Sequence, residues 1–412
     1  MDHSIQYPAL ILLMGGLVVA GIFVKAGLKQ IGLPDLVGFL FLGLLLRLID
    51  TRYPFLGPGV GEMLHLLGKI GLIMLLFRIG LESNLAGLLR QLRSAGLVWS
   101  ADVSLSGLVG FIVPFYILGF GWMPSLLTGA AFTATSVGIS VAVWHDRNAV
   151  RTPSGELLLD VAELDDISAV VIMALIFSLL PRLDDGGGST VIWAVVAEQL
   201  GTFAVKLLIF GLLCFLFARY IEKHITALFR NLHPRADLII VVVGIGIIIA
   251  AVSDMIGFSL AIGAFFAGLV FSRDPDAVKQ DSSLIPIYEL FTPFFFISIG
   301  LNIAPGALLN SLFIGGILVL FAAAVKIAAV GLPVWGLKDR ISAALIGISM
   351  VPRAEIAMVI VQAGHRQGNA IMPAALFNGM ILVCAITCIL TPVVIRRLLK
   401  KWPPQKAPGE RR

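Results

Sequence analysis

The chain of 412 residues is 58% hydrophobic and only 13% charged, with 30 Lys and Arg against 25 Asp and Glu. A mean hydropathy of +0.98 excludes a soluble protein, because so much apolar surface cannot be hidden from water. The basic residues are scattered between apolar runs, which disfavours nucleic-acid binding and is typical of membrane-edge anchors. We therefore expect an all-α polytopic membrane protein.

Thirteen apolar runs are long enough to be transmembrane helices across a hydrocarbon core of roughly 30 Å. The first, at about 7–24, has no basic residue before it and no small-residue cleavage site, so we expect a retained span rather than a signal peptide. The others are predicted at about 33–49, 64–81, 94–118, 123–144, 157–180, 190–219, 237–254, 256–272, 284–301, 308–335, 341–363 and 370–395.

Most Lys and Arg residues between the spans follow the odd-numbered ones. By the positive-inside rule, this asymmetry predicts an N-terminus outside and a C-terminus in the cytoplasm. We expect a multi-pass protein of a bacterial-type inner membrane.

The two halves of the chain carry an internal repeat. Residues 31–43 (IGLPDLVGFLFLG) align with residues 256–268 (IGFSLAIGAFFAG), and their glycines coincide. Because an odd number of spans separates the copies, they are predicted to cross the membrane in opposite senses, as inverted six-helix repeats. Such repeats are characteristic of secondary transporters, whose binding sites lie at the membrane midplane between discontinuous helices.

Two predicted spans, one in each repeat, carry helix interruptions. Residues 132–138 combine small hydroxyl side chains with a glycine, and residues 350–355 contain Pro352, which removes a helix hydrogen bond. If both helices break and cross, Glu355 is placed to neutralise a half-helix N-terminus and Arg353 a C-terminus. The alternative is that Arg353 and Glu355 form a plain buried salt bridge.

Asp165 and Asp166 lie near the middle of the apolar run 157–180. An ionised carboxylate at that depth costs about 2.5 to 3.5 kcal/mol, so the pair is expected to mark an ion or proton path. The alternative is a pair of protonated structural acids. Lys326, deep in the run 308–335, also needs a counter-charge, for which the aspartate pair is the obvious candidate.

Five motifs occur in a characteristic order along the chain. They are Thr133-Ala134-Thr135-Ser136, Asp165-Asp166, Phe294-Phe295-Phe296-Ile297-Ser298-Ile299-Gly300, Lys326 and Pro352-Arg353-Ala354-Glu355. With these motifs, the chain resembles monovalent cation:proton antiporters of the branch that holds the NapA-type and Kef-type proteins.

The resemblance implies a NapA-like fold of thirteen transmembrane helices with two discontinuous crossing helices, which assembles as a homodimer. It also implies a core that moves like an elevator against a scaffold. The scaffold is expected at about 1–92 and 237–305, a linker helix at about 190–220, and the core at about 93–182 and 306–396.

By the same resemblance, Asp166 matches the cation-binding aspartate, so Na⁺ is expected there. Asp165 matches the acid that pairs with the lysine at Lys326, an arrangement associated with electrogenic sodium/proton exchange. Kef-type potassium systems typically have a glutamine in place of Asp165, which favours sodium. Oxygens of Thr133 and Thr135 are expected to complete the ion's shell, because a hard cation needs several oxygen ligands.

Two positions depart from the family pattern. Glu163 occupies a position that is usually apolar, and Arg78 replaces an aliphatic residue. Asp160 and Glu163 lie on the cytoplasmic side of Asp166 in the predicted topology, and we expect them to line an acidic inner funnel that concentrates cations.

The predicted function is a secondary active antiporter that exchanges cytoplasmic Na⁺ for external H⁺. We expect no cofactor and no enzymatic activity, because the chain shows no nucleotide loop, nucleophile elbow or metal-hydrolase spacing. The alternatives are a K⁺/H⁺ antiporter and, on the same fold, a passive cation channel or sensor. The expected partners are a monovalent cation, protons, the lipid bilayer and a second copy of the chain, without nucleic acid.

Overall fold

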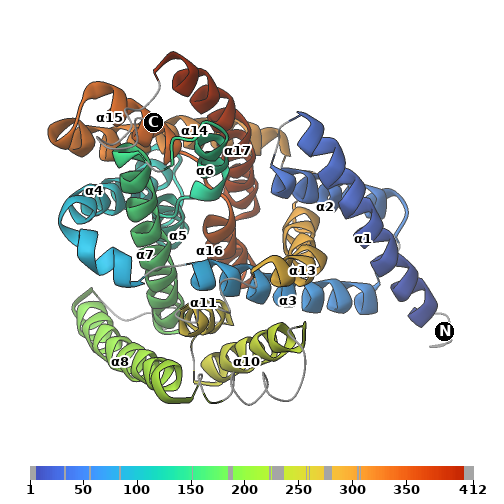
Figure 1. Cartoon of the computed structure of the whole chain (residues 1–412). Coiled ribbons are helices and arrows are strands. Elements are labelled where there is room, and N and C mark those ends of the chain that lie inside the picture. The colour runs from blue at the N-terminus through green and yellow to red at the C-terminus, as the bar shows by residue number, and fades with distance from the viewer. Residues whose placement is uncertain are drawn as a thin grey trace. The chain divides into compact units, whose positions relative to one another are not determined.

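The computed structural model is all-helical over the part of the chain that it describes (Figure 1). That part comprises residues 6–31, 34–54, 57–82, 85–150, 152–183, 189–221, 224, 236–256, 258, 260–272, 281–303, 306 and 308–402. The helices are α1 (Gln6–Ile31), α2 (Asp35–Arg52), α3 (Pro58–Glu82), α4 (Leu85–Ile112), α5 (Trp122–Thr133), α6 (Val137–Asp146), α7 (Pro153–Leu183), α8 (Ser189–Leu216), α10 (Ala236–Met255), α11 (Leu260–Phe271), α13 (Asp281–Leu301), α14 (Leu308–Leu337), α15 (Arg340–Ser349), α16 (Glu355–Arg366) and α17 (Ala374–Lys401). Short π-helical segments extend α4 (Val113–Ile117) and α8 (Phe217–Ile221).

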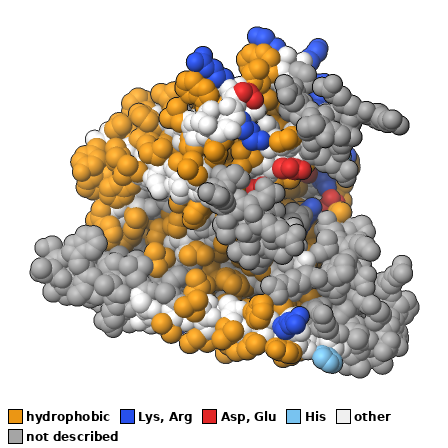
Figure 2. Space-filling view, turned by 60° about the vertical axis from the view of Figure 1, so that its left-hand side comes forward, with side chains coloured by type: hydrophobic (Ala, Val, Ile, Leu, Met, Phe, Trp, Pro, Cys, Tyr) orange, Lys and Arg blue, Asp and Glu red, His pale blue; other side chains and the backbone are white. Residues whose placement is uncertain are grey.

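Within the described residues, six helices are long and apolar enough to cross a membrane unaided. They are Leu10–Gln30, Gly59–Leu81, Ala95–Ile117, Leu284–Leu301, Ser311–Leu337 and Ala374–Lys401. Each coincides with a predicted span, while the count of thirteen and the inverted topology stay predictions. Hydrophobic side chains cover much of one face (Figure 2), and exposed ones include Leu12 and Phe313, as expected where lipid replaces water.

The chain forms two compact units. The first contains Met1–Gly57, Leu85–Ala169 and Phe296–Arg412, and the second contains Pro58–Asn84 and Val170–Phe295. These boundaries are not those expected for the scaffold and the core, and that functional division stays a prediction.

Two helices of the first unit are interrupted where the sequence predicts it. α5 ends at Thr133 and the chain resumes as α6 at Val137, while α15 ends at Ser349 and α16 begins at Glu355. Pro352 lies in the second interruption, where its missing backbone N–H removes no hydrogen bond from a helix. Around them, α4 packs against α5 and α14, and α16 packs against α5 and α17.

The two interruptions are joined directly by hydrogen bonds. The backbone N–H of Ser136 donates to the carbonyl of Pro352 at 2.9 Å, which satisfies two groups that the breaks release. One turn away, the hydroxyl of Ser140 donates to the carbonyl of Ser349 at 2.7 Å. The indole of the buried Trp144 donates to the Ser349 hydroxyl at 2.9 Å. Polar contacts thus fix the register of the two broken helices.

In the second unit, α3 and α11 approach closely through glycines. A Cβ atom at Gly80 would overlap the carbonyl oxygen of Phe265, and one at Gly268 would overlap the carbonyl oxygen of Phe77. Small residues of this kind let two helices pack backbone to backbone, and such close packing is one of the forces that hold helices together in lipid.

We predict that Gly268→Ala destabilises the protein although alanine favours a helix by roughly 1 kcal/mol. The overlap with the backbone of α3 forces the helices apart, and rigid backbone cannot yield as a side chain would. The matched control is Gly244→Ala on α10, where an added Cβ meets nothing within 4 Å. Thermal unfolding in detergent should give a lower midpoint for the first variant and an unchanged or higher one for the second. Equal midpoints would contradict the close packing.

Candidate functional site

A fully buried lysine on α14 is the centre of the site. Lys326 is 0% exposed, and its ammonium forms ion pairs with Asp165 of α7, at 2.8 Å, and with Asp102 of α4. It also donates to the carbonyl of Thr133, at 3.2 Å, where α5 ends. An ammonium has three protons, and three oxygens from three helices receive them.

Asp102 is the residue that sequence reasoning missed. Its side chain is fully buried, and its second oxygen accepts a hydrogen bond from the Ser106 hydroxyl at 2.8 Å. The available signal was an acid inside the apolar run 94–118, which is the same signal that singled out Asp165.

Asp165 has one satisfied and one unsatisfied oxygen. Its Oδ2 accepts from Lys326 and from the Thr135 hydroxyl, the latter at 2.7 Å. Its Oδ1 is buried and has no hydrogen-bond partner among the described residues. A buried carboxylate oxygen without a donor is costly, by more than the 1–3 kcal/mol typical of neutral groups, so this atom suits a proton or a cation.

Arg353 lies fully buried in the interruption before α16. Its Nη1 donates to the carbonyl of Ala134 at 2.7 Å and reaches the Thr135 hydroxyl at 3.5 Å. The last carbonyls of a helix have no partners within the helix and carry its partial negative charge, so the guanidinium compensates the end of α5. Glu355 occupies the first turn of α16, where an acid is favourable.

The other predicted site residues belong to α5 and α7. Asp166 follows Asp165 on α7 and is half-buried; consecutive helical residues project about 100° apart. The Thr133 hydroxyl donates to the carbonyl of Ala130 at 2.8 Å, so its lone pairs remain as possible ligands. Asp160 is half-buried, with one buried oxygen that has no hydrogen-bond partner in the described part of the chain. The side chain of Glu163 lies outside the described residues.

Arg78, the other departure from the family pattern, belongs to the second unit. Its guanidinium lies over the Tyr288 ring, 4.6 Å from the ring centroid. This cation–π contact gives the charge a structural role within that unit.

Broken helices that meet beside buried charges are typical of secondary transporters. Comparison with known families agrees: the family described as "Sodium/hydrogen exchanger, transmembrane" matches residues 14–401. The chain belongs to this family of membrane antiporters, as its five motifs indicated.

Individual relatives are similar over most of the chain. It is 27% identical to the high-affinity Na⁺/H⁺ antiporter NhaS3 of Synechocystis, over 84% of this chain and 74% of that protein. It is 26% identical to a Na⁺/H⁺ antiporter of Enterococcus hirae, over 90% of this chain and 94% of that one. It is also 27% identical to the K⁺/H⁺ antiporter subunit KhtU of Bacillus subtilis, over 85% of each chain.

Among solved structures, the fold resembles that of the sodium proton antiporter MjNhaP1 from Methanocaldococcus jannaschii. The TM-score is 0.66 at 18% sequence identity, over 95% of this chain and 97% of that one. At this identity the likeness concerns the fold.

We predict that Asp102 and Asp165 are coupled through Lys326. Asp102→Asn or Asp165→Asn leaves the ammonium one carboxylate, whereas the double variant leaves it none, and an uncompensated buried charge costs about 3–5 kcal/mol. The double variant should therefore lose about 0.5–3 kcal/mol more stability than the two single losses together.

Unfolding of the four proteins of this cycle in detergent measures the coupling. Adding Lys326→Gln to the double variant should restore part of the lost stability, because it removes the orphaned charge. Strictly additive losses would show that Lys326 does not depend on both acids.

Proposed function

We propose that the protein exports cytoplasmic Na⁺ in exchange for external H⁺, as an electrogenic antiporter. The observation that carries the proposal is the buried Lys326–Asp165 pair beside the break of α5, with one Asp165 oxygen left without a hydrogen-bond donor among the described residues. Family membership supports exchange of a monovalent cation for protons, and two relatives are named as Na⁺/H⁺ antiporters.

The proposed topology has thirteen spans in inverted repeats, an outer N-terminus and a cytoplasmic C-terminus. The proposed assembly is a homodimer in a bacterial-type inner membrane. The proposed exchange requires no cofactor, because the transported ions are themselves the substrates. The core, about 93–182 and 306–396, moves against the scaffold to expose the site alternately to each side.

Asp166 is the residue proposed to hold Na⁺ and H⁺ in turn. One carboxylate cannot bind both at once, so competition for it couples the two fluxes. Asp165 precedes Asp166 on α7 and accepts a hydrogen bond from the Thr135 hydroxyl just beyond the end of α5, and Thr133 adds hydroxyl lone pairs. Together these groups offer the set of oxygens that a hard cation needs when it leaves water.

Asp165 and Lys326 are proposed to supply the second transported proton. Their ion pair forms when the site is proton-free and breaks when Asp165 takes a proton. With two protons in and one sodium out, one net charge enters per cycle, so 100 mV contributes about 2.3 kcal/mol of driving force. Asp102 lowers the energetic cost of breaking this ion pair, because a second carboxylate remains paired with the Lys326 ammonium.

Arg353 and Glu355 are proposed to hold the crossing of the broken helices. Arg353 compensates the end of α5 through the Ala134 carbonyl, and Glu355 stands at the start of α16. Asp160 and Glu163, earlier on α7, are proposed to draw cations toward Asp166 from the cytoplasm.

K⁺/H⁺ exchange is the second candidate function. The similarity to the K⁺/H⁺ antiporter subunit KhtU favours it, at the same identity as to NhaS3. Ion selectivity in a liposome assay separates the two candidates.

We predict that Asp166→Asn abolishes cation-driven proton movement, because an amide neither takes up a proton nor offers a charged ligand. The purified protein is reconstituted in liposomes with an internal pH dye, and Na⁺ or K⁺ is added outside. Asp254→Asn on α10, an exposed acid of the second unit, is the matched control and should behave as wild type. Exchange at the wild-type rate in Asp166→Asn would refute the central role of this residue.

We further predict that Asp165→Asn retains exchange but loses its response to voltage. Asp102 still compensates Lys326 in this variant, so the site folds, while the carrier of the second proton is gone. Exchange is measured at zero and at a clamped inside-negative potential, with wild-type protein in parallel. An unchanged voltage response would remove Asp165 from the charge-carrying step.

A further inference from the structure

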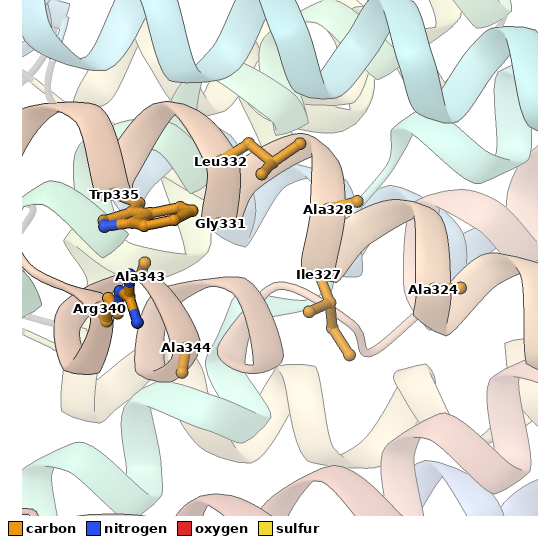
Figure 3. Close-up of a pocket in the computed structure, with 9 residues that line it drawn as sticks. All are labelled: Ala324, Ile327, Ala328, Gly331, Leu332, Trp335, Arg340, Ala343 and Ala344. Carbon is orange, nitrogen blue, oxygen red and sulfur yellow. The ribbon is translucent and has the colours of Figure 1, made fainter.

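An open groove of about 380 Å³ runs between α14 and α15 (Figure 3). Its lining has one charged side chain, that of Arg340, and is otherwise apolar. The lining residues are Ala324, Ile327, Ala328, Gly331, Leu332, Trp335, Arg340, Ala343 and Ala344.

Small residues create the groove. Ala324, Ala328 and Gly331 recur at helical spacing along α14, and Ala343 and Ala344 line the groove from α15. The helices approach closely at Gly347, where a Cβ would lie 3.0 Å from the Ile327 carbonyl oxygen. The space between the helices is therefore fixed by tight backbone packing.

The groove is open to the surroundings rather than part of the ion site. Leu332 is 61% exposed and Trp335 is 48% exposed, whereas Lys326 on the same helix is fully buried. In a membrane protein, such an exposed apolar surface lies against lipid. The groove thus follows the back of the helix whose other face holds the buried charge cluster.

The length of the groove matches one leaflet. From Ala324 to Trp335 it follows eleven residue steps of α14, about 16 Å at 1.5 Å per residue. This is about half of a hydrocarbon core of roughly 30 Å. Trp335 lies at the end of the groove away from the membrane centre, as tryptophans do at the membrane–water interface. A lipid chain that enters beside Trp335 would reach mid-membrane at Ala324.

The positive charge of Arg340, at the same end of the groove as Trp335, suits an anionic headgroup. The exposed Arg340 guanidinium stacks over the Trp335 ring, 4.7 Å from its centroid. A guanidinium that stacks through its face keeps its in-plane N–H groups as donors for a ligand. Its neighbours are engaged elsewhere: Lys338 donates to the Pro153 carbonyl at 2.7 Å, and Asp339 accepts from the backbone N–H groups of Ile341 and Ser342 at 2.8 Å. Arginine binds phosphate through two parallel hydrogen bonds.

We propose that this groove binds one anionic phospholipid, with an acyl chain along α14 and the phosphate on Arg340. The lipid would brace α14 against α15, the helices that lead to Lys326 and to the interruption at Arg353. Binding depends on neither the transported cation nor the proton stoichiometry, so the proposal stands apart from the proposed function.

The test compares the thermal midpoint of the purified protein in neutral detergent with added phosphatidylglycerol, phosphatidylcholine or glycerol phosphate. Wild type should be stabilised more by phosphatidylglycerol than by phosphatidylcholine, and not by glycerol phosphate. Arg340→Gln should abolish the difference between the two lipids, and Arg340→Lys should keep part of it. Ala328→Leu fills the groove and should reduce the shift with both lipids. Native mass spectrometry should show one retained phospholipid fewer in Arg340→Gln.

The controls are Arg397→Gln, an exposed cation of α17, and Ala26→Leu, an exposed alanine of α1. Both should respond as wild type does. An equal response of wild type to the two lipids, or an unchanged response in Arg340→Gln, would overturn the proposal. A full shift with glycerol phosphate alone would assign Arg340 to a free phosphate instead. A change of oligomeric state in Ala328→Leu would assign the groove to a second copy of the chain.

Discussion

The structure of the first unit depends on compensating one buried ammonium. Lys326 lies where an unpaired charge would cost several kcal/mol, and even a buried pair repays its desolvation only with good geometry and further hydrogen bonds. Those conditions are met by bringing α4, α5 and α7 to a single point on α14. Because Lys326 lies 161 to 224 residues after its three partners, the cluster ties α14 to helices of the other half of the chain. The candidate ion site and the fold around it therefore depend on the same charges.

The interrupted helices follow from the same requirement. Ending α5 at Thr133 frees carbonyl groups that lipid cannot satisfy, and two of them, on Thr133 and Ala134, accept hydrogen bonds from Lys326 and Arg353. The side chains of Lys326 and Arg353 thus replace hydrogen bonds that a continuous helix would have made. Because Thr135 lies in the non-helical segment after α5, its hydroxyl reaches Asp165 and donates a hydrogen bond to it. A continuous helix would direct this hydroxyl elsewhere. The carbonyl groups freed by the helix break and the buried charges of Lys326 and Arg353 therefore stabilise each other.

The sequence predicted those parts of this arrangement that depend on local chemistry. Hydroxyl residues at 133–136 and a proline at 352 indicated the interruptions, and charges in apolar runs indicated the site. Asp102 was not predicted, because it lies 224 residues from Lys326 and a lone acid does not reveal which helix it faces. The groove at Arg340 was missed for a related reason: alanines and glycines indicate close packing, and only the relative angle of two helices decides where a gap opens. The division into units depends on the same non-local packing.

Two carboxylates against one lysine change what a transport cycle requires of this site. With a single acid partner, each neutralisation of that acid would leave a bare ammonium in a low-dielectric interior, a state that costs more than the membrane potential supplies in one step. With Asp102 fixed by the Ser106 hydroxyl and paired with Lys326, the ammonium keeps a counter-charge whichever state Asp165 adopts. The cost of the cycle then falls on Asp165 and Asp166, the groups proposed to exchange ions. α14 can consequently keep its position within the proposed moving core through the cycle, and a lipid bound along its exposed face would favour the same rigidity.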